Sequence, residues 1–415
     1  MSTRRQFLGA AAVGGVAVPL LSHADWAAAA AAPYTGNTLV VVFLRGGCDG
    51  LSVLAPVADP AYHAARPTIS VPEAAALPLT GVASRADFGW HPAATRLAQL
   101  YGAGRVAAVP AAGSPDHSRS HFDCQAGEEA GRPEDRTSVA GGWLGRYLAG
   151  TSANDHPLRA FTAGSGLPAS LRGYGAISAP SLDQLGLIPW GPEPTWAMSA
   201  ITAGYTADRA GADLSMWAGT TIGALTEVAP LTTSGTQPPA GWPGGELARG
   251  LYTVARLVES GLPMQVATVD LGDWDHHSEM GSATDATGRT HKKVTELDSA
   301  IGAFFDRLDA AGAGGRVTLV TMTEFGRRVH ENDSGGVDHG WGGPMLVVGA
   351  GVSPGVKGPW PGVAPLSLDN GDLAVTVDHR RVLSELLVRR LAAPNLADVF
   401  PGFNAAPATW VGVTG

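Results

Sequence analysis

The segment from Arg316 to Ala350 constrains the fold most strongly, because it sets two buried strands on either side of a loop that is dense in reactive side chains. The runs VTLVTM (317–322) and MLVVGA (345–350) are apolar and rich in β-branched residues, as expected of core strands. The side chains between them that suit metal binding or proton transfer are Glu324, Arg327, Arg328, His330, Asp333, Asp338 and His339. Parallel α/β sheets carry their chemistry at strand ends, so this loop predicts a divalent-metal site. The alternative is structural: Glu324 pairs with Arg327, and Asp338 caps a turn.

The N-terminal segment predicts export. Residues 2–8 read STRRQFL, and an Ala/Gly-rich apolar run follows over 9–21. That run is too short and too weakly hydrophobic to span a membrane, and the small residues at 27–32 suit cleavage. We interpret residues 1–32 as a twin-arginine signal rather than a chance arginine pair. The mature chain is then expected to be periplasmic, in the cell envelope or secreted, with no transmembrane span. Because this route carries folded proteins, it also favours a bound metal.

Charge and cysteine content exclude several classes of protein. The chain has a formal net charge of −9, and residues 1–32 contribute +1 through Arg4, Arg5 and Asp25, so the remainder carries −10. Such an acidic chain is a poor partner for nucleic acid. Two cysteines, Cys48 and Cys124, exclude a disulfide-rich scaffold or a cysteine-ligated zinc finger.

Strand and helix patterns alternate along the chain. We expect strands at 37–45, 106–110, 158–162 and 265–271, and helices at 91–104, from 121, from 141, and at 246–258, 292–310 and 378–391. Residues 181–245 read as an insertion or cap, because Pro and Gly cluster there and the periodicity weakens. The pattern predicts one α/β domain over 33–415, with central parallel strands covered on both faces.

Two more polar clusters follow predicted strands. Asp49 comes after Gly46-Gly47, where glycines allow a sharp turn and the close approach of another group. The sequence GDWDHHSEM places Asp273, Asp275, His276, His277 and Glu279 after the 265–271 strand. Adjacent carboxylates and imidazoles suit metal ligation. A glycine-rich turn at Asp49 and a solvated polar loop at 273–279 are the structural alternatives.

Ser120 precedes the helix expected from residue 121. It can cap that helix, with Asp123 bonding back, or it can act as a nucleophile where the helix N-terminus stabilises negative charge. The sequence leaves both readings open.

The order of these motifs resembles the domain of unknown function 1501 family. The resemblance runs from RRQFL through RGGCDGL, the His91-Pro92 helix, SRSHFD, GGWLGR, DWDHH, TEFGR and DHGWGG to VFPGF, and covers essentially the whole mature chain. That family in turn resembles the alkaline phosphatase and sulfatase superfamily, which implies a three-layer αβα sandwich around a mainly parallel sheet, with one or two metal sites.

The resemblance also implies roles for particular residues. Ser120 matches the nucleophile, and Arg119 or Arg327 would balance charge on the transferred group. The implied metal ligands are Asp49, Asp275, His277, Glu324, Asp338 and His339, with Asp273 as an alternative to the middle pair. The metal would be zinc, calcium, magnesium or manganese. Glu324 departs from the superfamily pattern, because it stands where an Asp-His dipeptide is usual.

Two functions from different classes are compatible with these features. The first is an exported metal-dependent hydrolase that acts on a small-molecule or glycan phosphate or sulfate ester. The second is a non-catalytic envelope or secreted protein that binds a partner protein or glycan. Both readings expect the predicted ligands to meet in one pocket at the carboxyl-terminal edge of the sheet. Both hypotheses also expect Cys48 to lie near Cys124, with the two cysteines either joined in a disulfide or present as two buried thiols.

Overall fold

The computed structural model describes residues 33–151, 156–186, 204 and 212–415. The predicted export signal, residues 1–32, lies outside the described residues, as does much of the predicted insertion. Within the described parts, no helix combines the length and apolar character needed to cross a bilayer.

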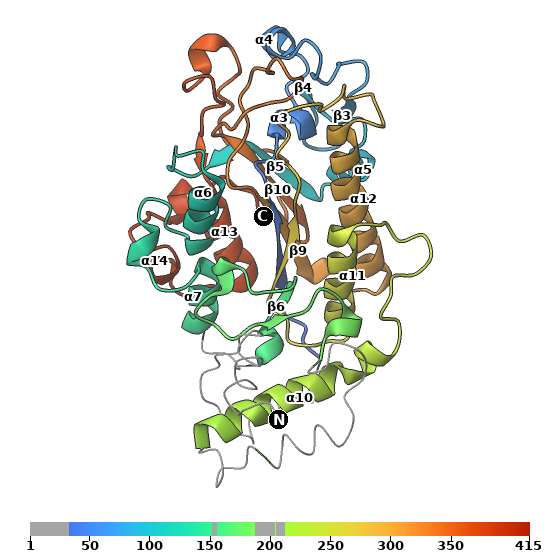
Figure 1. Cartoon of the computed structure of the whole chain (residues 1–415), viewed down its shortest axis with the longest axis vertical. Coiled ribbons are helices and arrows are strands. Elements are labelled where there is room, and N and C mark those ends of the chain that lie inside the picture. Colours follow the sequence, from blue (N-terminus) through green and yellow to red (C-terminus); the bar gives the residue numbers. More distant parts are fainter. Residues whose placement is uncertain (1–32, 152–155, 187–203, 205–211) are drawn as a thin grey trace.

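The described residues form a nine-stranded sheet at the centre of the fold (Figure 1). Its strands are β1 (Thr38–Leu44), β5 (Val106–Gly113), β6 (Ala160–Ala163), β7 (Ile177–Ser178), β8 (Val266–Leu271), β9 (Val317–Met322), β10 (Gly343–Gly349), β11 (Gly355–Val356) and β12 (Val377–Asp378). The order is β11-β5-β10-β9-β1-β8-β6-β7, with β12 also paired to β5. Of these strands, β10 alone runs antiparallel to its neighbours β5 and β9. The expectation of a mainly parallel sheet is confirmed.

Helices cover both faces of the sheet (Figure 1). One layer consists of α5 (Thr95–Gly102), α11 (Glu246–Glu259) and α12 (Arg289–Ala310). The other consists of α6 (His121–Ala130), α7 (Trp143–Gly150), α13 (His379–Leu391) and α14 (Leu396–Val399). Side chains of β1 point alternately to the two layers: Val40 and Val42 join the core of the first, Leu39 and Val41 that of the second. This is the predicted three-layer sandwich.

Smaller elements close the two ends of the sandwich. A three-stranded sheet of β2 (Leu54–Ala55), β4 (Arg85–Trp90) and β3 (Leu77–Leu79) lies at the upper end in Figure 1 with α3 (Gly50–Val53) and α4 (Pro60–Ala65). The sequence pattern did not predict this sheet, because its strands are short. Helix α10 (Ala212–Thr233), from the predicted insertion, lies at the opposite end.

The turn after β1 brings two strand ends together. Gly46 and Gly47 have φ of +112° and +73°, values that favour glycine. A Cβ on Gly46 would lie 2.8 Å from the backbone nitrogen of Asp275, so the turn and the β8 loop touch through backbone. The predicted close approach of another group to these glycines is therefore present, and it positions the loop that carries Asp275.

Candidate metal centre

Four loops meet at one edge of the sheet. Strands β1, β5, β8 and β9 run the same way, so the loops that follow them emerge at this edge, and antiparallel β10 begins there. The edge is the upper one in Figure 1, next to the N-terminus of α6. Polar residues that are up to 218 positions apart, such as His121 and His339, can thus occupy one site.

Asp275 lies at the centre of the polar cluster. Its Oδ1 atom is 3.1 Å from Nε2 of His277, 3.2 Å from Nε2 of His339 and 2.5 Å from Nη2 of Arg327. Its Oδ2 atom is 3.5 Å from Nε2 of His121. One ligand-type atom from each of His121, Asp275 and His339 lies within 4.8 Å of the others. The structure therefore gathers three imidazoles around one carboxylate.

Hydrogen bonds on the outer side of each ring assign the imidazole tautomers. Nδ1 of His339 donates to the carbonyl of Arg119 at 2.9 Å, and Nδ1 of His277 donates to Oδ1 of Asp338 at 2.9 Å. In the neutral rings both Nε2 atoms then carry lone pairs, yet they lie 3.0 Å apart. Only an added proton or a cation can sit favourably between them. This is the donor arrangement that a metal ion requires.

His121 has the same arrangement through Glu324. Its Nδ1 atom lies 2.8 Å from Oε1 of Glu324, an oxygen that also accepts hydrogen bonds from the Gly46 amide at 2.8 Å and from Gln125 Nε2 at 2.9 Å. Glu324 is 1% exposed, whereas Nε2 of His121 is buried without a hydrogen-bond partner among the described residues. A buried imidazole nitrogen that faces Asp275 and lacks a partner fits a metal ligand.

Glu324 and Asp338 therefore lie behind the imidazoles, against the nitrogens that point away from Asp275. The resemblance implied that both bind the metal directly, and that role stays a prediction. Their observed position is the one from which carboxylates orient histidine ligands.

Arg327 is buried beneath the cluster. Its guanidinium donates to the carbonyls of Gly47 at 2.7 Å and Val337 at 3.1 Å, to the carbonyl of Gly46, and to Asp275. With its donors committed and 2% of the residue exposed, Arg327 holds the loops together and fixes Asp275. The expected charge balance on a transferred group by Arg327 stays untested, but the guanidinium faces protein.

The charge of Asp275 is set by its neighbours. Burial alone would raise the pKa of this carboxyl, but the hydrogen bond and charge of Arg327, with His277 and His339, lower the pKa to about 2. Burial lowers the pKa of His339. Asp275 is thus an anion and His339 a neutral base at neutral pH, the protonation states that a metal ligand needs.

Asp49 pairs with Arg66. Its Oδ2 and Oδ1 atoms accept hydrogen bonds from Arg66 Nη1 at 2.6 Å and Nη2 at 2.9 Å, and Oδ2 also accepts from Ser52. Both side chains are buried. The Arg66 guanidinium occupies both carboxylate oxygens, and the expected role of Asp49 as a metal ligand in the same pocket stays a prediction.

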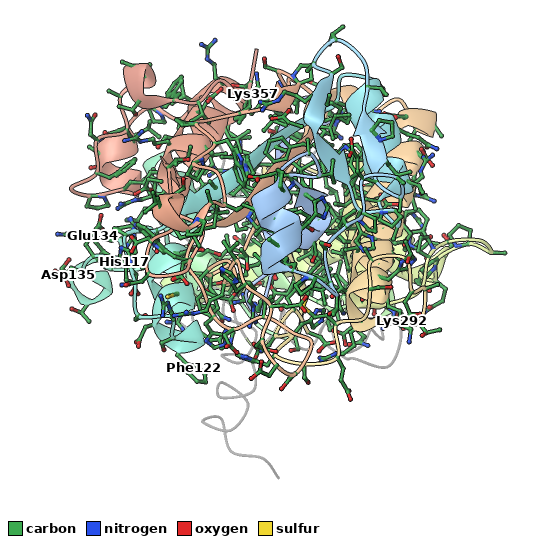
Figure 2. The ribbon with its side chains drawn as sticks, turned by 90° about the horizontal axis from the view of Figure 1, so that it is seen from above. His117, Phe122, Glu134, Asp135, Lys292 and Lys357 are labelled. Carbon is green, nitrogen blue, oxygen red and sulfur yellow. The ribbon has the colours of Figure 1, made fainter. Side chains whose placement is uncertain are left out.

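Ser120 caps α6, as one of the two open readings predicted. Its hydroxyl accepts a hydrogen bond from the Asp123 amide at 3.4 Å, a long contact. Arg119, just before it, has φ of 54° and offers a half-exposed guanidinium beside the cluster. The nucleophilic role of Ser120 remains a prediction. Figure 2 shows His117 and Phe122, from the same segment, projecting outward at the molecular surface.

The disulfide that the sequence suggested does not form: Cys48 and Cys124 are both buried free thiols. Cys48 packs into the core under β1, whereas Sγ of Cys124 contacts Ser118 Oγ at 3.3 Å. The two-thiol alternative describes the structure.

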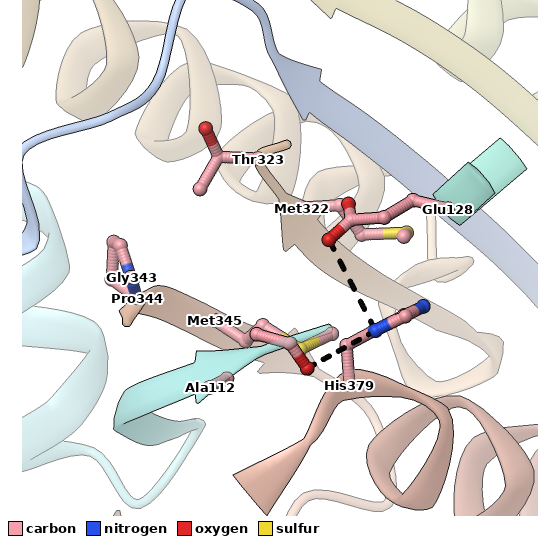
Figure 3. A pocket seen from close by; sticks show the side chains of 9 residues that line it. Ala112, Glu128, Met322, Thr323, Gly343, Pro344, Met345 and His379 are labelled. Atoms are coloured by element: carbon pink, nitrogen blue, oxygen red, sulfur yellow. Dashed lines mark hydrogen bonds and ion pairs between the residues drawn. The ribbon is translucent and has the colours of Figure 1, made fainter. Parts of the chain in front are cut away.

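A separate buried acid lies below the edge. Figure 3 shows Glu128 and His379 in a small cavity that Thr323 also lines, with His379 Nδ1 4.0 Å from Glu128 Oε1 and 3.2 Å from the Gly113 carbonyl. Burial, together with the charges of Glu324 and Asp378, holds the pKa of Glu128 well above its usual range. Glu128 is therefore uncharged and adds no negative charge to the cluster.

Sequence reasoning missed His121, Gln125 and Arg66. His121 was treated only as the first residue of a helix, although an imidazole beside the proposed nucleophile was a usable signal. The pairings of Gln125 with Glu324 and of Arg66 with Asp49 join segments remote in sequence, which no local pattern indicates.

No curated protein matches this chain. Solved structures that are similar include a sulfatase from Pseudoalteromonas sp. (11% identity, 86% of this chain and 68% of that chain covered, TM-score 0.33). They also include an alkaline phosphatase superfamily protein from Vibrio parahaemolyticus (11% identity, 78% and 63% covered, TM-score 0.37). A third, described in connection with glycosaminoglycan metabolism in Bacteroides thetaiotaomicron, has 10% identity, 91% and 82% coverage and a TM-score of 0.41.

The family model described as "Protein of unknown function (DUF1501)" matches residues 101–386, a span that includes the whole candidate metal centre. The resemblance found in the sequence is confirmed at the family level. This chain belongs to the DUF1501 family.

Proposed function

We propose that this protein binds a divalent metal ion through Asp275, His121, His277 and His339, and that it hydrolyses phosphate or sulfate esters outside the cytoplasm. One observation carries the proposal: the Nε2 atoms of all three imidazoles face the Asp275 carboxylate, while their Nδ1 atoms are engaged elsewhere. A nitrogen-rich donor set favours zinc over calcium, magnesium and manganese, which prefer oxygen ligands.

The supporting groups have defined tasks in this proposal. Glu324, Asp338 and the Arg119 carbonyl hold the three rings in the tautomers that expose Nε2. Arg327 keeps Asp275 ionised and oriented. Side-chain exposures of 44% for Asp275 and 24% for His339 leave one side of the cluster open to a substrate.

A bound divalent cation would stabilise the negative charge that develops on the ester oxygens. Ser120, directly before His121, would attack phosphorus or sulfur through Oγ. The proton of the Ser120 hydroxyl would leave with the alcohol, and water would then cleave the seryl ester, release phosphate or sulfate and restore the hydroxyl. Export rests on the STRRQFL segment.

The Asp49–Arg66 pair supports the second candidate, a non-catalytic envelope protein, because it removes a carboxylate that the superfamily resemblance assigned to the metal. An assay separates the two. Metal-loaded protein is incubated with aryl phosphates and aryl sulfates, with Ser120→Ala as the test variant and Ser138→Ala, on an exposed turn, as the matched control. Turnover that is lost in Ser120→Ala and kept in Ser138→Ala supports the hydrolase. No turnover by metal-loaded wild type supports the non-catalytic protein.

A further inference from the structure

Two arginines share one buried carboxylate beside the candidate metal centre. Asp372 is 2% exposed, and its Oδ2 atom accepts a hydrogen bond from Arg119 Nη2 at 2.5 Å. Its Oδ1 atom lies 3.8 Å from Nε of Arg328 and has no hydrogen-bond partner among the described residues. Two guanidinium groups therefore share one buried carboxylate, and Asp369 and Asp338 are the other charged groups that interact with this set.

Most of the hydrogen-bond donors of these two arginines are free. A guanidinium group carries five N–H donors. Arg119 commits one of its nitrogens to Asp372, and the guanidinium of Arg328 makes no hydrogen bond to the described residues. Their side chains are 32% and 39% exposed, so the free donors can reach a ligand. Arg327, by contrast, is buried with its donors occupied.

The backbones of the two arginines are joined to the outer side of the imidazole cluster. The Arg119 carbonyl accepts from Nδ1 of His339. The Arg328 amide donates at 3.0 Å to the carbonyl of Asp338, whose side chain accepts from Nδ1 of His277. In both rings Nδ1 and Nε2 point in divergent directions, and Nε2 faces Asp275. The Arg119 backbone therefore lies on the side of His339 that points away from Asp275, and Arg328 is joined to the residue that holds His277.

We propose that Arg119 and Arg328 form an oxyanion subsite that binds an anionic substituent of the substrate other than the ester at the metal. This inference rests on the proposed function for its identification of the substrate, which would carry at least two anionic groups. Paired planar guanidinium groups match the oxygens of a sulfate or phosphate group and bind them in bidentate fashion. Asp372 holds the two arginines near each other despite their like charge.

The test is oxyanion binding to protein freed of metal with a chelator, because that measurement is independent of catalysis and of metal loading. Inorganic sulfate is titrated by calorimetry into wild type, Arg119→Gln and Arg328→Gln. Arg85→Gln is the matched control, since Arg85 is a guanidinium of the same 39% exposure paired with one carboxylate, Asp87, on β4. We expect a roughly tenfold or greater loss of affinity in both test variants, as for lost charge-assisted hydrogen bonds, and no loss in the control. Equal affinity in wild type and Arg328→Gln would overturn the subsite.

A second titration identifies the source of the anion. An organic monosulfate that binds more tightly than inorganic sulfate, with the advantage lost in Arg328→Gln, supports a substituent on a larger substrate. Equal affinities for the two anions overturn the substrate assignment.

Asp275→Asn separates the two proposals. Sulfate binding that survives in this variant upholds the subsite, whatever happens to the metal site. Sulfate binding that is lost with Asp275 contradicts a separate subsite.

Discussion

Nε2 of His277 and Nε2 of His339 lie 3.0 Å apart, although the outer nitrogens of both rings already donate to Asp338 and to the Arg119 carbonyl. Two lone pairs held at this distance beside an ionised Asp275 make an unfavourable arrangement that a cation relieves. The predictions below follow from this geometry and from the contacts that hold it.

Glu324→Gln is expected to weaken divalent-metal binding by about 10- to 100-fold, because an amide is a poorer acceptor for Nδ1 of His121 and no longer fixes its tautomer. Affinity is measured by competition with a chromophoric chelator. The matched control is Glu385→Gln, another buried carboxylate that accepts backbone hydrogen bonds, from Gly412 and Thr414 on the far side of the fold. Equal loss of metal affinity in both variants would point to a general effect on folding.

Arg66→Met is expected to lower the free energy of unfolding by about 3–5 kcal/mol, because it leaves the buried Asp49 carboxylate without its partner. The double variant Asp49→Asn with Arg66→Met should lose less than the sum of the two single variants. Denaturant unfolding of the four proteins measures the coupling. Strict additivity would show that the two charges do not interact.

Gly326→Ala should disrupt the site loop, since a Cβ there would lie 1.6 Å from the Gly342 carbonyl oxygen. We expect a loss of stability of about 2 kcal/mol or more, together with loss of metal binding. Gly272→Ala is the control, because a Cβ at that strand end meets nothing within 4 Å. Its unfolding midpoint should stay close to that of wild type, and a Gly326→Ala protein as stable as the control would contradict the structure.

His91 makes stability depend on pH. Burial, with the nearby His291, lowers the pKa of His91 from 6.5 to about 4, whereas Asp49 acts in the opposite direction. Between these two values the unfolded chain binds more protons, so the free energy of unfolding should fall as the pH drops from about 6.5 to 4. The contribution of this residue is about 3 kcal/mol. Chelator-treated wild type and His91→Gln are unfolded in denaturant across this range, and parallel pH curves would contradict the assignment.

Both thiols should be countable only after unfolding. Burial raises the pKa of Cys48 well above its usual range and that of Cys124 to about 12, so neither reacts readily in the folded protein. Alkylation in denaturant without reductant should modify two thiols per chain. If no thiol is modified, the two cysteines form a disulfide and this prediction is wrong.

Local sequence patterns predicted the long strands of the sheet well, because each is an apolar run that indicates a buried strand. TLVVVFL at 38–44 and VTLVTM at 317–322 are buried at every position, as their sequences indicate. The helix from His91 begins later than expected, at Thr95, because His91 and Ala94 form a turn before it. The antiparallel direction of β10 was not foreseen, because strand direction depends on the path of the 323–342 loop.

The polar cluster was predicted in part. Asp275, His277 and His339 were identified because each lies in a run of ligand-type residues beside a strand. The pairing of Asp49 with Arg66, and the presence of His121 in the polar cluster, depend on which side chains meet across the edge of the sheet. A lone His at the start of a helix and a lone Arg after α4 carry no local sign of their partners, so only the three-dimensional structure reveals them.

The metal content of protein purified from its natural host, followed through gel filtration, tests the central claim most directly. The account predicts about one tightly held divalent transition-metal ion per chain in wild type. It also predicts loss of that ion in Asp275→Asn and His339→Gln, and its retention in Asp49→Asn. A folded wild-type protein that binds no such ion, even when zinc or manganese is supplied, or a metal content unchanged in Asp275→Asn, would contradict it.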